Sequence, residues 1–159
     1  MTEQATADAV HHSIVVPLAV NRAFALFTDR IGSWWPAGYQ IGSAPYQSAF
    51  VEPRVGGRWY ERGTDGSECD WGRVLAYDPP HFISLAWQIG ADWRHDPDPA
   101  HGSIVDVRFT PEGDGTHVEL THHGFDRHPS GGDAVRAAVG GPNGWTSVLA
   151  SFQQQASSE

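Results

Sequence analysis

The stretch EPRVGGRWYERGTDGSECDWGRVLAYDPPHFISLAW, residues 52–87, decides the fold. Aromatic and β-branched residues recur along it in short runs, which is typical of strands. Three clusters of turn-forming residues separate these runs: Val55-Gly56-Gly57, Thr64-Asp65-Gly66 and Asp78-Pro79-Pro80. Because such short connections join antiparallel neighbours, the stretch predicts consecutive strands of one antiparallel sheet.

Similar runs on both sides of this stretch extend the sheet. The candidate strands are Tyr46 to Glu52, Arg58 to Arg62, Cys69 to Tyr77, Phe82 to Ile89, Ser103 to Thr110 and Thr116 to His123. A seventh β-rich run, His12 to Val16, is stopped by Pro17. Alternation along the last three of the six predicts one concave surface. Its residues are Ile83, Leu85, Trp87, Val105, Val107, Phe109, Val118, Leu120 and His122.

Helical spacing of apolar residues is found near both ends of the chain. The first stripe consists of Val20, Phe24, Phe27 and Ile31, and the second of Trp145, Val148, Leu149 and Phe152. The first predicts a helix broken near Asp29 into two short pieces. Trp34 and Trp35 flank the same buried stripe before Pro36 and Gly38 end the helix.

The segment before the last helix is also helical in pattern. It runs from Asp133 to Val139 and is interrupted by Gly140-Gly141-Pro142, which predicts a kink or a split. We expect the last helix to pack on the sheet. The sequence therefore predicts an α+β fold in which a strongly bent antiparallel sheet wraps around a C-terminal helix.

Composition limits the class of protein and of partner. A chain of 159 residues with 40% hydrophobic residues fits one globular domain. Its net charge of −9, with ten scattered arginines, makes nucleic acid and anionic membranes poor partners. Cys69 is the single cysteine, so neither an internal disulfide nor a thiolate cluster within the chain is expected.

The two ends suggest how the chain is organised. Residues 1–9 and 155–159 are polar and predict flexible tails around a single domain at 10–154. The opening lacks a basic and an apolar signal region, and the sequence has no run of about 18 apolar residues. We therefore expect a cytoplasmic protein that does not span a membrane.

Several stretches of the chain resemble a known family. The stretch 52–87, the later GTHVELTHHGF at 115–125 and the pair Gly144-Trp145 are similar to the domain named after the activator of the Hsp90 ATPase. That family belongs to the SRPBCC or START-like superfamily, and the resemblance covers residues 10–154. The matching positions are Gly56, Gly57, Trp59, Gly72, Val74, Pro79, Pro80, Leu120, His122, Gly124, Phe125, Gly144 and Trp145.

The resemblance implies a helix-grip fold. In this fold a curved seven-stranded antiparallel sheet grips a C-terminal helix, two short helices follow the first strand, and apolar molecules bind in a cavity between sheet and helix. The break at Gly140-Gly141-Pro142 departs from a long unbroken helix and leaves the cavity mouth undefined. Fold alone does not choose a function within such a superfamily.

Tryptophans dominate the candidate ligand site. If Trp34 and Trp35 continue the helix, they point about 100° apart, so that one seals the core and the other faces the cavity mouth; alternatively both are core residues. Trp59, Trp71, Trp87 and Trp93 allow the same two interpretations. The predicted ligand-binding residues are Trp34, Trp35, Trp59, Trp71, Trp87, Val107, Phe109, His122, Trp145 and Leu149.

Polar candidates give weaker signals. His122 faces inward by strand parity, whereas His123 faces outward, so these two and His128 do not predict a metal site. The loop at 94–101 carries His95, Asp96, Asp98 and His101, and is a cation site, a lid or a solvated loop. Glu61, Glu68 and Asp70 are acid/base candidates or ion-pair partners of Arg58, Arg62 and Arg73. No catalytic residue, metal or cofactor is assigned.

Three functions from different classes stay open. The first is a module that binds a small apolar or aromatic molecule in the helix-grip cavity. The second is a cyclase, dehydratase or hydrolase in the same cavity, which a histidine or carboxylate facing the ligand would indicate. The third is a chaperone-stimulating interaction module, which an absent cavity and an exposed apolar patch would favour. A homodimer is common for such domains and also stays open.

Overall fold

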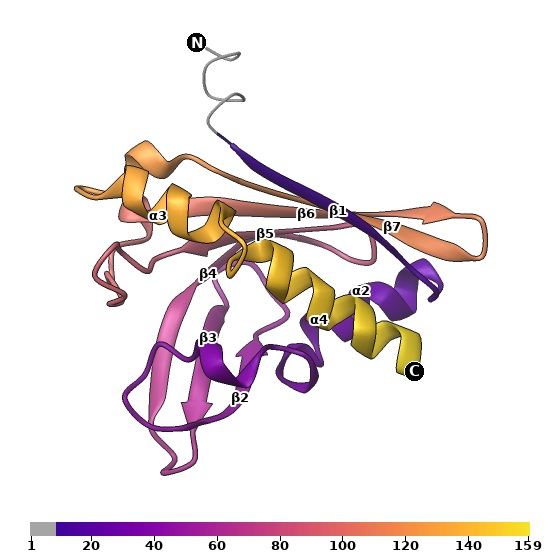
Figure 1. Cartoon of the computed structure of the whole chain (residues 1–159), viewed down its shortest axis with the longest axis horizontal. Coiled ribbons are helices and arrows are strands. Elements are labelled where there is room, and N and C mark those ends of the chain that lie inside the picture. The colour runs from indigo at the N-terminus through magenta and orange to yellow at the C-terminus, as the bar shows by residue number, and fades with distance from the viewer. Residues whose placement is uncertain (1–8) are drawn as a thin grey trace.

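The computed structural model describes residues 9–159, and it contains one seven-stranded antiparallel sheet (Figure 1). The strand order is β1-β7-β6-β5-β4-β3-β2. The strands are β1 (Val10–Val16), β2 (Tyr46–Val51), β3 (Arg58–Gly63), β4 (Glu68–Asp78), β5 (Phe82–Trp87), β6 (Ser103–Glu112) and β7 (Gly115–His123). The tail expected at 1–9 falls, except for Ala9, outside the described residues.

Three α-helices and four short 3₁₀ turns complete the fold of residues 9–159. They are α2 (Val20–Thr28), η1 (Ile31–Ser33), η2 (Ala37–Tyr39), η3 (Pro99–His101), η4 (Phe125–Arg127), α3 (Gly132–Gly140) and α4 (Trp145–Ser158). The fold is α+β and helix-grip-like, which confirms the predicted fold class. No helix in the described part of the chain is long and apolar enough to cross a membrane.

The sheet bends at β4, which pairs with β3 through its first half and with β5 through its second. The pairing of β3 with β4 shifts its register between Trp59 and Tyr60 of β3. The pairing of β4 with β5 shifts its register between Val74 and Ala76 of β4. Gly72 lies between them, and a Cβ there would stand 1.7 Å from the carbonyl oxygen of Ala86. Glycine is therefore required where the two halves of the sheet approach each other.

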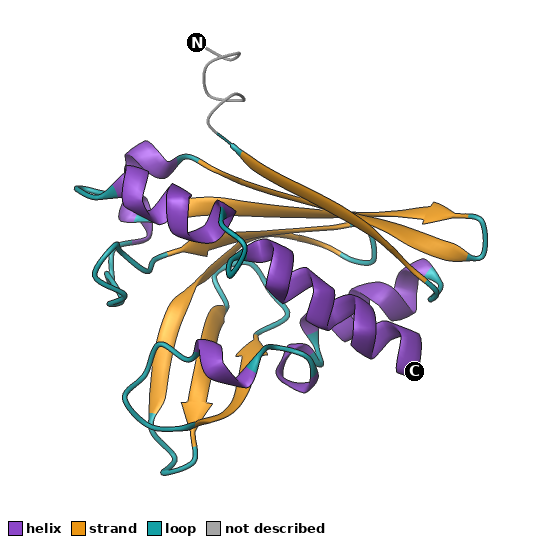
Figure 2. Ribbon diagram, in the orientation of Figure 1, coloured by secondary structure: helices purple, strands orange, loops and turns teal. Residues whose placement is uncertain are grey.

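Helix α4 crosses the angle that this bend creates (Figure 2). Its buried side chains Trp145, Val148, Leu149 and Phe152 form the predicted stripe. Ala156 continues the stripe and is also buried, so the helix extends to Ser158. Residues 155–158, which the sequence predicts as part of a flexible tail, are thus the last residues of this helix.

The breaks in the helical pattern fall where the sequence predicts them. Helix α2 ends at Thr28 and η1 follows, which gives two short pieces. Trp34 and Trp35 lie beyond η1, so they are not on a continuous α-helix. Helices α3 and α4 are separate, and a Cβ at Gly144 between them would stand 2.0 Å from the carbonyl oxygen of Val139. The predicted kink or split is a split.

Candidate functional site

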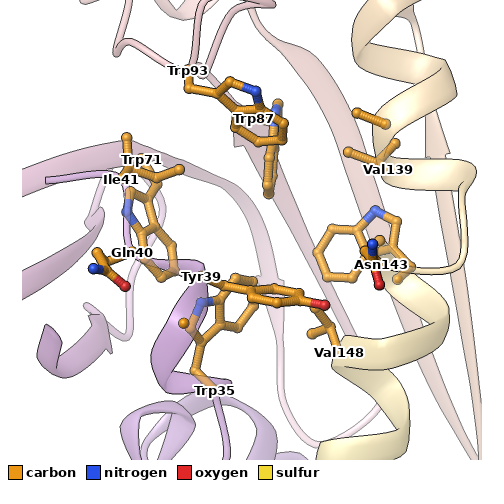
Figure 3. A pocket seen from close by; sticks show the side chains of 14 residues that line it. Trp35, Tyr39, Gln40, Ile41, Trp71, Trp87, Trp93, Val139, Asn143 and Val148 are labelled. Carbon is orange, nitrogen blue, oxygen red and sulfur yellow. The ribbon is translucent and has the colours of Figure 1, made fainter.

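A cavity of about 540 Å³ lies between the bent half of the sheet, the α3–α4 junction and the segment that follows Trp35. Side chains from these elements surround a central space (Figure 3). The lining residues are Trp35, Gly38, Tyr39, Gln40, Ile41, Trp71, Trp87, Trp93, Ala138, Val139, Asn143, Gly144, Trp145 and Val148. The cavity thus combines residues that are far apart in the sequence.

Four buried indoles form most of its wall. Trp71 comes from β4, Trp87 from the end of β5, Trp145 from the start of α4, and Trp35 from the chain after η1. The ring centroids of Trp35 and Trp71 are 4.8 Å apart, and those of Trp87 and Trp145 are 5.7 Å apart in an edge-to-face arrangement. Such contacts keep each ring in a fixed orientation. The wall is therefore a preformed aromatic surface.

Trp34 and Trp35 have different surroundings although they are neighbours in the chain. The Trp34 indole packs on Phe27 and Phe152, and its Nε1–H donates to the carbonyl oxygen of Leu26 at 2.9 Å. The Trp35 indole lines the cavity, and its buried Nε1 has no hydrogen-bond partner among the described residues. One tryptophan therefore belongs to the core and the other to the cavity wall.

A buried hydrogen-bonded chain holds Trp145 from behind. The indole Nε1–H of Trp145 donates to Nδ1 of His122 at 2.9 Å, because an indole nitrogen can only donate. His122 Nε2 therefore carries its proton and donates to Ser103 Oγ at 2.7 Å, and the Ser103 hydroxyl faces His128 Nε2 at 3.0 Å. Desolvation, with lesser contributions from His128 and His123, holds the pKa of His122 well below its ordinary value. The imidazole is thus neutral and orients Trp145.

A buried carboxylate holds Trp71 in a similar way. Glu61 is 1% exposed, and its Oε1 accepts hydrogen bonds from Trp71 Nε1 at 2.9 Å and from the backbone amide of Ile41. Burial, with a smaller contribution from the Glu61 charge, raises the pKa of the nearby Tyr46 to about 12. The carboxylate lies behind the wall rather than in the lining.

The rim of the cavity is formed by loop residues. Trp93 is 52% exposed and has a φ of 60°, which is uncommon for a residue with a bulky side chain. A tight turn holds this conformation, because Trp93 N donates to Gly90 O and Gly90 N donates to Arg94 O. In the view of Figure 3, Trp93 and Tyr39 lie on opposite sides of the space. The rim therefore adds two further aromatic rings.

The ten predicted ligand-binding residues divide into two groups. Trp35, Trp71, Trp87 and Trp145 line the cavity. The residues outside the lining are Trp34, Trp59, Val107, Phe109, His122 and Leu149, all of them buried. Helix α2 covers the concave face at Phe109, where Phe24 and Phe27 pack at centroid distances of 5.2 and 5.6 Å. Trp59 packs on Trp71, and His122 packs on Phe125. Whether any of the ten binds a ligand stays a prediction.

Several lining residues were not in the predicted set. Tyr39, Gln40 and Ile41 lie in a segment whose proline and glycines indicate the end of a helix, with no periodicity that would indicate a wall. Asn143 lies in the split between α3 and α4. The only sequence signal for Trp93 was its aromatic side chain.

The charged candidates are mostly engaged with one another. Glu68 pairs with Arg58 and Arg62, and Asp70 pairs with Arg58 and Arg73, which confirms the ion-pair interpretation for these two carboxylates. That interpretation is wrong for Glu61, which is buried on the other face of the sheet.

Residues within the loop at 94–101 form ion pairs with one another. His101 pairs with Asp96 at 2.9 Å and with Asp98 at 3.5 Å. None of its residues lines the cavity, among those that the structure describes. Trp93 immediately before the loop does so instead, which places the rim of the cavity one residue outside the predicted lid.

Comparison with known proteins places this geometry in a family. The model of the family described as Activator of Hsp90 ATPase homolog 1-like protein matches residues 17–156. Among solved structures, the anthrahydroquino-γ-pyrone synthase Txn09, complexed with SUM, is 38% identical, with 92% of this chain and 95% of that chain covered and a TM-score of 0.65. No curated protein matches the sequence.

Two further structures extend the comparison. The self-sacrificing resistance protein CalC from Micromonospora echinospora is 30% identical, with 93% of each chain covered and a TM-score of 0.68. Protein NE0264 from Nitrosomonas europaea is 15% identical, with 94% of this chain and 95% of that chain covered and a TM-score of 0.65, and it supports the fold alone. The chain therefore belongs to the Activator of Hsp90 ATPase homolog 1-like family of the SRPBCC superfamily.

Proposed function

We propose that the protein binds an uncharged, planar aromatic molecule in this cavity. The observation that carries the proposal is the wall of four indoles from four separate parts of the chain. The lining contains no charged side chain among the described residues. A charged ligand would lose its hydration there without gaining a counter-ion, which is costly. Flat apolar rings would instead gain contact with several indoles at once.

Size and polarity favour the same class of ligand. A volume of about 540 Å³ falls within the range of about 300–1,000 Å³ that small-molecule sites occupy. The polar side chains of the lining are Tyr39, Gln40 and Asn143, besides the indoles. Each carries a group that can hydrogen-bond to a hydroxyl or carbonyl substituent. A polycyclic phenol or quinone matches this combination.

The relatives support this ligand class. The chain is 38% identical to Txn09 over 92% of its own length, and that protein is named a synthase of an anthrahydroquino-γ-pyrone. Such a product is polycyclic and aromatic. The similarity to CalC, a resistance protein, is compatible with binding as well as with chemistry.

A matched pair of variants on α3 tests the proposal. Ala138 lines the cavity, whereas Ala137 is exposed on the same helix outside the lining. We expect saturable quenching of tryptophan fluorescence by an uncharged dihydroxyanthraquinone in the wild type and in Ala137→Trp, each measured against its own unliganded spectrum. Ala138→Trp fills the mouth and should lower the affinity at least about tenfold.

The charge requirement provides the second arm of this experiment. An anthraquinone sulfonate, which has the same ring system and one negative charge, should bind at least about tenfold more weakly than the dihydroxyanthraquinone. Isothermal titration calorimetry measures both. The proposal is wrong if neither compound binds, if the sulfonate binds equally well, or if Ala138→Trp binds as tightly as Ala137→Trp.

An enzymatic reaction in the same cavity is the second candidate. The observation in its favour is the 38% identity to a synthase. Glu61 and His122, the buried titratable groups nearest the wall, contact Trp71 and Trp145 from behind rather than line the space. Mass spectrometry of the dihydroxyanthraquinone after prolonged incubation with the protein would reveal a changed mass if the compound is a substrate.

The interaction-module alternative is not proposed. An absent cavity and an exposed apolar patch would favour it, and the structure contains a cavity of about 540 Å³.

A further inference from the structure

Glu61 is a buried carboxylate with an unusual set of partners. In the described chain, its hydrogen-bond donors are two neutral groups, the indole nitrogen of Trp71 and the backbone amide of Ile41. The arginines of this part of the sheet lie elsewhere, because Arg58, Arg62 and Arg73 pair with Glu68 and Asp70. Burial of a carboxylate without a cation is unfavourable for folding. Its position therefore calls for an explanation other than stability.

Both donors belong to the cavity. Trp71 and Ile41 each line it, one from β4 and the other from the segment at 37–44. A single oxygen of Glu61 thus fixes two parts of the wall that are 30 residues apart in the sequence. Loss of this oxygen would free both parts together.

The segment at 37–44 is held to the rest of the protein by the packing of Tyr39, Ile41 and the buried Ala44 and by one hydrogen bond. It contributes Gly38, Tyr39, Gln40 and Ile41 to the lining. Within residues 9–159, the bond from the Ile41 amide to Glu61 is its one hydrogen bond to a residue distant in the sequence; the bond from Tyr39 N ends at the adjacent Pro36. Gln40 and Ile41 face Val139 and Asn143 across the cavity (Figure 3). The segment therefore covers one side of the space.

We propose that Glu61 is a positioning residue that latches the segment at 37–44 over the cavity and, through the same oxygen, fixes the Trp71 indole. Ligand entry and release then require the bond between Glu61 and Ile41 to open. The closed segment encloses the ligand, and the reopened one exposes it to solvent. This inference rests on the proposed function for its ligand, but the latch itself is a property of the unliganded protein.

Substitutions of Glu61 test the latch directly. Glu61→Met keeps the length of the side chain and removes both acceptor oxygens, whereas Glu61→Gln keeps one oxygen that can accept the same two bonds. Glu68→Met is the matched control, because Glu68 lies on the neighbouring strand and pairs with arginines instead. Each variant is compared with the wild-type protein as the full chain.

Three readouts report different parts of the latch. In Glu61→Met we expect hydrogen exchange of the Ile41 amide to accelerate at least about tenfold. Dissociation of the dihydroxyanthraquinone, measured by stopped-flow fluorescence, should also accelerate about tenfold. The indole proton resonance of Trp71 should also shift. Glu61→Gln should restore all three in part, and Glu68→Met should leave them unchanged. A purely structural role of Glu61 would not link exchange at Ile41 to the rate of ligand release.

A second pair of variants covers the case in which Glu61→Met does not fold. Ile41→Pro removes the amide proton, and the extended backbone of Gln40, at φ −68° and ψ 149°, accommodates a following proline. Ile41→Ala keeps the amide and removes the side chain. We expect faster ligand dissociation in Ile41→Pro than in Ile41→Ala, with the Trp71 resonance near its wild-type position in both.

Failure of the latch is distinguishable from failure of the proposed function. If the wild type does not bind the dihydroxyanthraquinone, the proposed function fails, while exchange at Ile41 and the Trp71 resonance still decide about the latch. If the compound binds but dissociates at the same rate from wild type, Glu61→Met and Ile41→Pro, the latch is wrong. Unchanged exchange at Ile41 in a folded Glu61→Met protein also overturns it.

Discussion

Single replacements of Trp34 and Trp35 by phenylalanine should affect different properties, stability in the case of Trp34 and ligand affinity in the case of Trp35. The two residues are adjacent, both are buried, and each substitution removes the same atoms. They differ in what the indole contacts, since Trp34 packs in the core and Trp35 lines the cavity. The pair is therefore its own control for the chemistry of the substitution.

The cost of Trp34→Phe follows from the carbonyl that it leaves behind. In a continuing helix the amide of Arg30 would bond to Leu26 O, but it donates to Ala25 O instead, so that the Trp34 indole serves Leu26. An unpaired buried carbonyl costs about 1–3 kcal/mol. The smaller ring also leaves a void worth about 1 kcal/mol. We expect destabilisation of about 2–4 kcal/mol.

Trp35→Phe should cost much less. The Trp35 Nε1 has no partner in the described chain, so its removal breaks no hydrogen bond and eliminates an unsatisfied buried donor. This gain offsets most of the roughly 1 kcal/mol that the reduced packing costs. The expected change in the free energy of unfolding is within about 1 kcal/mol of zero. Affinity for the dihydroxyanthraquinone should fall about threefold to tenfold, because part of the stacking surface is lost.

Urea unfolding followed by far-ultraviolet circular dichroism measures the first quantity, and calorimetric titration measures the second. Equal m-values in the three proteins are needed for the comparison of their free energies. A Trp35→Phe protein that is destabilised as much as Trp34→Phe would refute the assignment of the two indoles. The assignment would also be refuted if Trp34→Phe bound the dihydroxyanthraquinone more weakly while Trp35→Phe bound it with the wild-type affinity.

Two further predictions concern pH and backbone strain. Burial lowers the pKa of His122, His95 and His128, so the unfolded chain takes up protons that the folded one excludes. The contribution of these histidines to stability should be constant above about pH 7. It should fall as the pH drops below the ordinary histidine value of 6.5, by up to about 1.4 kcal/mol per pH unit for His122 alone. Urea midpoints across this range check it, and a flat profile contradicts it. Trp93 has a φ of 60°, a conformation that glycine adopts without strain. Trp93→Gly should therefore be about 1 kcal/mol more stable than Trp93→Ala, the reverse of the usual order. Both variants should bind the dihydroxyanthraquinone more weakly than the wild type. Equal urea midpoints for these two variants would show that the turn is not strained.

Local sequence patterns were sufficient for the order and type of the elements. The turn clusters of residues 52–87 predicted consecutive antiparallel strands, and Gly140-Gly141-Pro142 predicted the break that separates α3 from α4. Spacing along the chain determined the buried stripe of α4 as far as Phe152. These features depend on residues close together in the sequence, which is why a single chain reveals them.

The candidate site depended on contacts between distant residues. Strand parity correctly placed Val107 and Phe109 on the concave face, but it does not say that α2 fills that part of the concavity. The same rule gave no reason to expect Glu61 beneath Trp71, or Ile41 above both. Side-chain volumes from separate segments decide where space remains in a close-packed interior.

The sequence by itself thus determined a helix-grip fold rich in inward-facing tryptophans. Only the tertiary structure decided which of them surround a cavity and which pack in the core, as Trp34 and Trp35 illustrate. The physical reason is that periodicity specifies the direction in which a side chain points, whereas a cavity exists only where no other segment of the chain fills the space in that direction.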